Sequence, residues 1–233
     1  HFTGSSDSVL IHNFFMDTTS FNPIYKPRFD SLGMIIDYYS ELFGRYPFWK
    51  EKYGHAMAPL SGGMEHQTMT TLGFFQSWLV AHELGHQWFG DKITCQSWEH
   101  IWLNEGFASW MENRIMQRLH PEWLPEFNAI GVRESAMGPD SMKTTHSVVQ
   151  HIETVEQANQ AFDTITYQKG EAVIRMLENY VGEEAWRKGV RAYMKKHAYS
   201  STVTKDFFDS IEKVCRDRPR GCRIRGYLFE VER

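Results

Sequence analysis

Apolar residues recur at intervals of three and four between residues 32 and 43, which is the spacing of one face of an α-helix. Asp30 stands where a helix cap is expected, and Gly44 followed by Pro47 supplies stop signals. The pattern therefore predicts an amphipathic helix that packs one face against a core. The apolar positions that carry it are Leu32, Ile35, Ile36, Tyr39, Leu42 and Phe43.

The pattern changes several times after this helix. Residues 53–70 contain several glycines and a proline and predict extended chain, and a helical stretch follows from about residue 75 to 89. A second helix is predicted from about Ile101 to Leu119, because Pro121 cannot continue it. Turn-forming and polar residues dominate from 137 to 159. Helical spacing then returns at Val173, Ile174 and Leu177, and again at Phe207, Phe208 and Ile211.

The composition is that of a globular chain. Of the 233 residues, 42% are apolar and 15% aromatic, which is enough for a packed core in one large domain or two modest lobes. The net charge of −4 is mild and the basic residues are dispersed along most of the chain, so no nucleic-acid partner is expected. No membrane segment is expected either, since no run of eighteen apolar residues occurs and the first thirty residues lack the apolar stretch of a signal peptide.

The cysteines predict neither a disulfide framework nor a thiolate metal site. There are three, Cys95, Cys215 and Cys222, without a paired Cys-X-X-Cys spacing. We interpret them as structural or incidental thiols. This interpretation favours a reducing compartment only weakly, so cytoplasmic, periplasmic and secreted locations all stay open.

The most informative feature of the chain is the run His82-Glu83-Leu84-Gly85-His86, followed by Glu105. Residues four apart lie on one face of a helix, so the two imidazoles can bind one ion while Glu83 projects beside them. Glu105, on the second predicted helix, supplies a third ligand. Three protein ligands leave one tetrahedral position open, which is typical of catalytic zinc. In that arrangement Glu83 can act as general base toward a zinc-activated water.

The same helical spacing predicts support for the metal ligands. Glu112 lies seven residues after Glu105 on the same helical face and is expected to accept a hydrogen bond from a histidine ligand. His100 is interpreted as a structural or solvated residue rather than a fourth ligand. Apolar packing around the two ligand helices is predicted for Trp88, Phe89, Trp102 and Trp110.

These motifs, with two others, resemble the zinc aminopeptidases related to aminopeptidase N and leukotriene hydrolase, which are gluzincins. Two signatures are His82 to Gly90, His-Glu-Leu-Gly-His-Gln-Trp-Phe-Gly, and Ile101 to Ser109, Ile-Trp-Leu-Asn-Glu-Gly-Phe-Ala-Ser. A third, Gly62-Gly63-Met64-Glu65-His66, is similar to the family's Gly-X-Met-Glu-Asn segment, with histidine where asparagine is usual. The fourth runs from Phe162 to Gly170. The resemblance covers roughly residues 20 to 214.

The resemblance implies roles for residues outside the metal group, which we define as His82, His86 and Glu105. Tyr167, in the fourth motif, would stabilise the oxyanion of the tetrahedral intermediate. Glu65 would bind the cationic α-amine of the substrate through a charge-assisted hydrogen bond. Glycine permits close approach of the backbone to a peptide that pairs like an added strand. The substrate-binding strand would contain Gly62, Gly63, Met64 and Glu65.

The resemblance also implies an α+β fold, namely a thermolysin-like zinc metallopeptidase catalytic domain with a small mixed β lobe and a mainly α-helical lobe. This domain would span residues 1–214, with the β-containing lobe at about 1–70 and the helical lobe at about 71–214. Residues 215–233 would form an atypical, arginine-rich tail that we expect to be poorly ordered. Because the family's proteins are larger, flanking domains of a parent protein are expected partners.

The implied function is a zinc-dependent aminopeptidase that binds one Zn²⁺ and hydrolyses the N-terminal peptide bond of peptides with a free N-terminus. An alternative is an isolated catalytic fragment that binds zinc and peptide but has little activity without flanking domains. A noncatalytic zinc module would need a fourth protein ligand, for which the sequence offers no convincing candidate. A peptide-binding module without activity disagrees with the intact Glu83 and Tyr167. The preferred N-terminal residue, the physiological substrate and the oligomeric state stay open.

Overall fold

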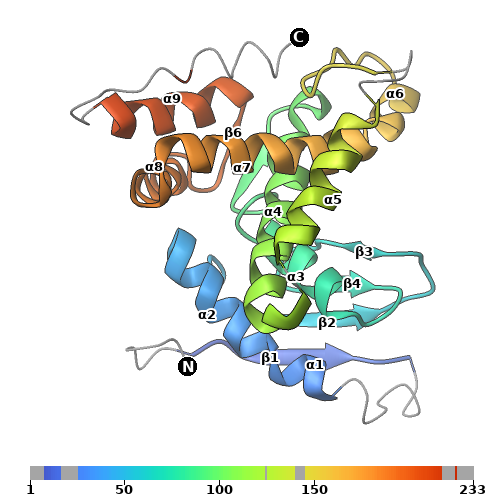
Figure 1. The fold of residues 1–233 in the computed structure, drawn as a ribbon. Coiled ribbons are helices and arrows are strands. Elements are labelled where there is room, and N and C mark those ends of the chain that lie inside the picture. The colour runs from blue at the N-terminus through green and yellow to red at the C-terminus, as the bar shows by residue number, and fades with distance from the viewer. Residues whose placement is uncertain (1–7, 17–25, 124, 140–144, 217–223, 225–233) are drawn as a thin grey trace.

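A small sheet lies beside a larger group of helices in the computed structural model (Figure 1). The structure describes residues 8–16, 26–123, 125–139, 145–216 and 224. The strands β1, β2 and β4 run parallel, whereas β3 pairs antiparallel with β4 and forms one edge of the sheet. Extended chain predicted for residues 53–70 therefore appears as β2, β3 and the start of β4. The strand order is β1 (Ile11–Phe14), β2 (Tyr53–Met57), β4 (Thr70–Leu72) and β3 (Gly63–Met64).

Helix α2 (Leu32–Phe43) follows the short helix α1 (Lys26–Asp30) and confirms the first predicted helix. Its apolar residues form a buried face, as their spacing requires. The predicted cap is wrong, because Ser31 is the N-cap residue and its side chain makes no capping hydrogen bond. Asp30 instead ends α1, where its carboxylate accepts a hydrogen bond from Lys26 Nζ at 3.1 Å.

Helices α3 (Ser77–His86) and α4 (Trp102–Leu119) pack against each other at the centre of the structure. Both confirm predicted helices, although α3 is shorter at each end than the sequence suggested. Every residue from Leu79 to His86 is buried, so α3 is enclosed rather than amphipathic. Strand β5 (Ile93–Cys95) and the 3₁₀-helix η1 (Trp98–His100) connect the two helices.

The C-terminal half is mainly helical. Helices α7 and α9 confirm the two helical patterns predicted there, and β6 pairs parallel with β5. Helix α6 lies in a region for which turns were predicted, and a capping box of Thr154 and Gln157 explains its start. The elements are η2 (Pro121–Trp123), α5 (Pro125–Met137), α6 (Val155–Gln160), the π-helix η4 (Ile165–Lys169), α7 (Gly170–Val181), α8 (Glu183–Lys196), β6 (Ser200–Thr202) and α9 (Thr204–Arg216).

Aromatic side chains fill the space around the two central helices. The rings of Phe89 and Phe107 stack with centroids 3.8 Å apart. Helices α4 and α7 approach closely where Gly106 meets Gly170, since a Cβ on Gly106 would lie 3.0 Å from the Gly170 backbone. The apolar packing predicted around the ligand helices is confirmed, with buried side chains at Trp88, Phe89, Trp102 and Trp110.

The structure corrects the prediction for the cysteines. Cys215 is buried and disulfide-bonded, whereas Cys95 has a free thiol. A disulfide depends on the distance between two residues in the fold, so sequence spacing alone did not reveal it. Helix α9 continues through Cys215 to Arg216, and Ile224 is buried. The rest of the predicted arginine-rich tail, residues 217–223 and 225–233, lies outside the described residues.

The architecture is mixed α and β and mostly helical, with a small sheet, as predicted. The finer prediction of a thermolysin-like domain with lobes divided near residue 70 stays a prediction. None of the described helices combines the length and the apolar character needed to cross a bilayer.

Candidate metal centre

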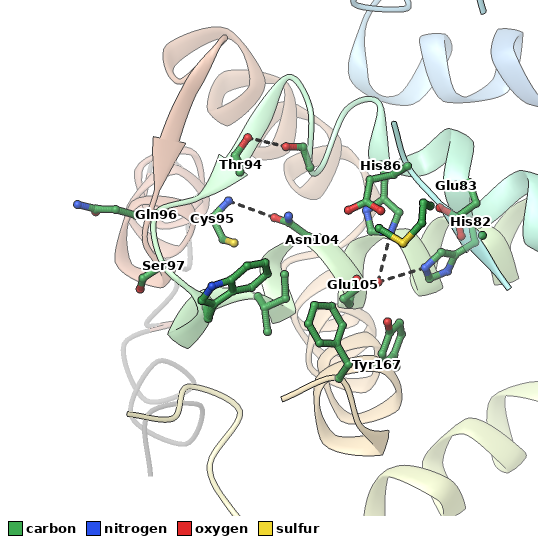
Figure 2. A pocket seen from close by; sticks show the side chains of 17 residues that line it. His82, Glu83, His86, Thr94, Cys95, Gln96, Ser97, Asn104, Glu105 and Tyr167 are labelled. Atoms are coloured by element: carbon green, nitrogen blue, oxygen red, sulfur yellow. Dashed lines mark hydrogen bonds and ion pairs between the residues drawn. The ribbon is translucent and has the colours of Figure 1, made fainter. Parts of the chain in front are cut away.

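Three side chains from α3 and α4 converge on one position (Figure 2). His82 and His86 lie one helical turn apart on α3, and Glu105 comes from the first turn of α4. Glu105 Oε2 lies 3.2 Å from Nε2 of each histidine, and the three potential ligand atoms lie within 4.8 Å of one another. All three residues are buried. Two imidazoles and one carboxylate thus surround a position that could hold a metal ion.

The outer nitrogens of the two imidazoles are held by other groups. His86 Nδ1 donates to the backbone carbonyl of Phe89 at 3.0 Å, and His82 Nδ1 donates to Glu112 Oε2 at 3.1 Å. In each ring, this arrangement leaves the lone pair of Nε2 available on the side that faces Glu105. Zinc is commonly bound by two imidazole nitrogens and one carboxylate oxygen. The donor set therefore fits zinc.

The charges of these groups stabilise one another. Burial disfavours protonation of His82, but its hydrogen bonds with Glu105 and Glu112 outweigh burial and raise its pKa to about 9. Burial also disfavours protonation of His86, and the charge of Glu105 nevertheless raises its pKa well above the usual value. Burial alone would raise the pKa of Glu105, whereas the two histidines lower it below the usual value. Because a metal binds neutral imidazole, protons and metal compete for these histidines.

Glu83 lies on α3 between the two histidines and lines the same cavity. It is buried, and burial raises its pKa to about 7 despite the opposing charges of the histidines. Strand β3 passes close to this carboxylate, since a Cβ added to Gly63 would lie 2.5 Å from Glu83 Oε1. Glycine at position 63 therefore leaves the space that the Glu83 carboxylate occupies.

Glu65 directly follows β3 at the edge of the sheet. With Met64 it lines the cavity, and one of its carboxylate oxygens lies within 4.8 Å of ligand atoms of Glu83 and His86. Gly62, just before β3, has a φ of 95°, which glycine adopts without strain. Two carboxylates in close proximity create a position that favours a cation. Glu65 and Glu83 thus give this side of the cavity an acidic character.

Tyr167 reaches the cavity from the π-helix η4. Its ring centroid lies 6.0 Å from that of His82 (Figure 2). Burial, and then the negative charge of Glu105, raise the pKa of the Tyr167 phenol above its usual value. The phenol is therefore protonated at neutral pH and able to donate a hydrogen bond.

Asp163 holds the start of this π-helix. Its Oδ1 accepts hydrogen bonds from the amides of Ile165 and Thr166 at 2.9 and 3.0 Å, and its backbone carbonyl accepts one from the Tyr167 amide at 3.1 Å. Its other carboxylate oxygen accepts a hydrogen bond from His146 Nε2 at 2.8 Å. π-Helical turns are rare and occur frequently at functional sites, which agrees with the place of Tyr167 on the cavity wall.

The two histidines and Glu105, together with Glu65, Glu83 and Tyr167, line one cavity of about 780 Å³. The sequence analysis did not predict a further wall of this cavity, which is formed by residues that come after α3 in the sequence. Asn104, beside Glu105 in its motif, ties this wall to α4, because its Oδ1 accepts a hydrogen bond from the Cys95 amide at 3.2 Å. The other wall residues lie on β5, on the loop and the 3₁₀-helix η1 that follow it, and between α6 and η4, without a recognisable spacing. They include Thr94, Cys95, Gln96, Ser97, Trp98 and Phe162.

Two further histidines lie apart from the metal group. His100 Nδ1 forms a hydrogen bond with Thr204 Oγ1 at 2.9 Å, in agreement with the structural role predicted for it. His66, which stands where the resemblance expects asparagine, forms a hydrogen bond with Thr71 Oγ1 at 2.8 Å in an exposed position.

Known proteins similar to this chain carry aminopeptidase names. Residues 75–221, more than half of the chain, match the peptidase family M1 domain. A probable aminopeptidase 2 from Sulfurisphaera tokodaii is 41% identical over 138 residues, and a leucyl aminopeptidase from Saccharolobus solfataricus is 41% identical over 137 residues. Aminopeptidase M1 from Arabidopsis thaliana is 39% identical over 134 residues. Each alignment covers 58% of this chain.

The same alignments cover only 17%, 18% and 15% of these relatives, so the chain spans less than a fifth of the length of each. The matched region begins after β3 and contains α3, α4 and η4, which carry the metal group and Tyr167. Since the family match covers more than half of its residues, this chain belongs to peptidase family M1.

Proposed function

We propose that this chain is the catalytic part of a zinc-dependent aminopeptidase, which hydrolyses the N-terminal bond of peptides with a free N-terminus. One observation carries the proposal. A single cavity brings the metal group of His82, His86 and Glu105 within reach of two further carboxylates, those of Glu83 and Glu65. A metal, a proton acceptor and an amine-binding anion are the parts that such hydrolysis requires.

His82, His86 and Glu105 would hold the zinc ion. When bound there, zinc supplies a Lewis acid that polarises the scissile carbonyl and makes water more acidic. Glu112 and the Phe89 carbonyl keep the two imidazoles oriented through their outer nitrogens.

Glu65 and strand β3 would bind the substrate. The carboxylate of Glu65 accepts hydrogen bonds from the cationic α-amine, which places the first peptide bond beside the metal group. Strand β3 lies at the edge of its sheet, so a peptide can pair with it as an added strand. Recognition of the amine limits cleavage to the first residue, and this limit distinguishes an aminopeptidase from an endopeptidase.

Glu83 and Tyr167 would carry the chemical steps that belong to the protein. Glu83 takes a proton from the attacking water and delivers it to the nitrogen of the leaving amine. Tyr167 keeps its phenolic proton and donates a hydrogen bond to the oxyanion as the carbonyl carbon becomes tetrahedral. Both side chains line the cavity beside the metal group.

Hydrolysis of aminoacyl chromogenic substrates tests this proposal. We expect zinc in a 1:1 ratio, product release that a chelator abolishes and zinc restores, and loss of activity in Glu83→Gln with zinc still bound. A zinc module that serves only folding would contain a fourth protein ligand, whereas the group found among the described residues contains three. If the chain binds zinc and peptide but does not turn over, the alternative of a fragment that needs flanking domains replaces the proposal.

A further inference from the structure

Gln87 follows the second histidine of the metal group, and the mechanism above gives it no part. Its side chain is 0% exposed, and its amide makes three hydrogen bonds. Oε1 accepts from the Thr68 amide at 2.9 Å and from the Tyr46 hydroxyl at 3.1 Å. Nε2 donates to the backbone carbonyl of Glu65 at 3.2 Å. A buried amide whose oxygen and nitrogen both have partners forms a rigid connection between the segments it joins.

Two of these three bonds hold the turn that follows β3. Thr68 has a φ of 63°, in the left-handed region that β-branched residues avoid. Gln87 accepts the hydrogen bond from the amide of this residue, and the Met69 amide donates to the His66 carbonyl at 3.0 Å. A strained backbone conformation of this kind persists only where surrounding contacts hold it. Gln87 supplies such contacts at both ends of the strained segment.

We propose that Gln87 is a positioning residue that sets Glu65 relative to the metal group and thereby makes the site selective for a free α-amine. The proposal depends on the function assigned above to Glu65. It follows from the geometry, because one side chain joins the end of the ligand helix α3 to the backbone of the residue that would bind the amine. The distance between amine and metal then determines that the first peptide bond is the one hydrolysed.

This role predicts a selective defect. His82 and His86 are oriented through Glu112 and the Phe89 carbonyl, and the Gln87 amide takes no part in either hydrogen bond. Removing that amide therefore leaves the metal ligands in place and releases the turn that carries Glu65. Binding of the amine weakens, whereas contacts with the rest of the peptide persist.

Calorimetric binding of two peptides to the zinc-loaded Glu83→Gln protein tests the inference without turnover. The peptides are Leu-Gly-Gly and its N-acetyl form, which lacks the cationic amine. We call this Glu83→Gln protein, with Gln87 intact, the parent of the variants below. We expect it to prefer the free amine by about tenfold or more, as for a hydrogen bond between charged groups. Adding Gln87→Met, which preserves size and removes all three bonds, is expected to reduce this preference to about threefold or less, with zinc content unchanged.

Tyr193→Phe is the matched control. It removes another buried side-chain hydrogen bond, that between Tyr193 and Thr202 at 2.7 Å, in the helical part of the fold. We expect it to lower stability without changing the preference for the free amine. If Gln87→Met does not fold, Gln87→Glu replaces it, because a carboxylate can still accept from Thr68 and Tyr46 but cannot donate to the Glu65 carbonyl.

The outcomes separate the inference from the proposed function. If the parent prefers the free amine and the Gln87 variants keep that preference, the positioning role is overturned and the aminopeptidase proposal survives. Equal losses of affinity for both peptides also overturn it, because they would indicate a purely structural residue. If the parent binds both peptides equally, the role of Glu65 fails and the inference fails with it, whereas chelator-sensitive turnover would still indicate a metallopeptidase.

Discussion

The metal group and the segments that face it are built in different ways. His82, His86 and Glu105 lie within two helices that are enclosed by aromatic side chains, and all three are buried. Glu65 follows a two-residue edge strand, and Tyr167 belongs to a five-residue π-helix. Packing between the helices and hydrogen bonds to the imidazoles hold the first set, whereas hydrogen bonds with Gln87 and Asp163 hold the turn after β3 and the start of η4.

This difference predicts how the two halves of the site respond to substitution. One half is the metal group, and the facing half consists of the segments that carry Glu65 and Tyr167. Close packing holds the two helices through many contacts, so the loss of one packing neighbour should move the helices little. The turn after β3 and the start of η4 each form two hydrogen bonds with one side chain, so their positions should depend more strongly on that residue. Substitution of a metal ligand on the helices should therefore remove the metal, whereas substitutions in the facing segments should affect turnover while the metal stays bound.

The largest effect is expected from His86→Ala. Loss of one imidazole leaves two protein ligands, so zinc affinity should fall by more than the roughly 10- to 100-fold typical of losing a supporting residue. Metal analysis after dialysis should show little zinc, and hydrolysis of aminoacyl substrates should disappear. His100→Ala is the control, since His100 pairs with Thr204 outside the cavity. If His86→Ala retains zinc and His100→Ala loses it, the assignment of ligands is refuted.

Tyr167→Phe should distinguish the two halves of the site most clearly, because it should lower turnover without changing the bound metal. The ring keeps its packing and only the hydroxyl is lost, so zinc content and the melting temperature should stay unchanged. Loss of an oxyanion donor typically lowers kcat about 10²- to 10³-fold. Steady-state kinetics on the zinc-loaded variant measures this change. A variant with normal kcat would assign the oxyanion contact to another group on the cavity wall.

The helical half of the site was predictable because local spacing determines it. Four-residue spacing placed His82 and His86 on one face, and seven-residue spacing placed Glu112 on the face of Glu105. The range of α2 followed from apolar periodicity and the breaker Gly44, and the end of α4 followed from the breaker Pro121. These features require no knowledge of which distant segments meet.

The facing half was less predictable because contacts between distant segments determine it. No local pattern shows that Gln87 reaches the backbone of Glu65, or that Asp163 shapes a π-helix. The cavity wall at Trp98 likewise depends on which distant segments meet. For Glu65 and Tyr167, the sequence indicated positions only through resemblance to a family, since a lone glutamate or tyrosine carries no signal of its own.

Gly63→Ala should change the position of one catalytic side chain without changing the metal. The added Cβ would lie 2.5 Å from Glu83 Oε1, so this flexible carboxylate must move. Misplacement of a reacting group by about 1 Å can lower the rate about 100-fold, and we expect kcat to fall about 10- to 100-fold. Gly33→Ala in α2 is the control, because nothing lies within 4 Å of its added Cβ. That control should raise stability by about 0.5–1 kcal/mol and leave kcat unchanged.

The smallest effect is expected from Asp163→Ala, which tests how strongly Tyr167 depends on its π-helix. The substitution removes the carboxylate that accepts from the Ile165 and Thr166 amides, and loss of a comparable helix cap lowers the free energy of unfolding by about 1 kcal/mol. Urea denaturation measures this change. We expect kcat to fall less than in Tyr167→Phe, because the Tyr167 hydroxyl is retained and still occupies its position in the cavity for part of the time.

Asp163→Asn is the matched control for this variant, because its amide oxygen can still accept both hydrogen bonds while the charge that faces His146 is lost. We expect it to keep most of the stability and most of the activity. If Asp163→Ala lowers stability but leaves kcat unchanged, packing and not the cap positions Tyr167. The two halves of the site would then be built alike, and the difference between them would be confined to the turn that carries Glu65.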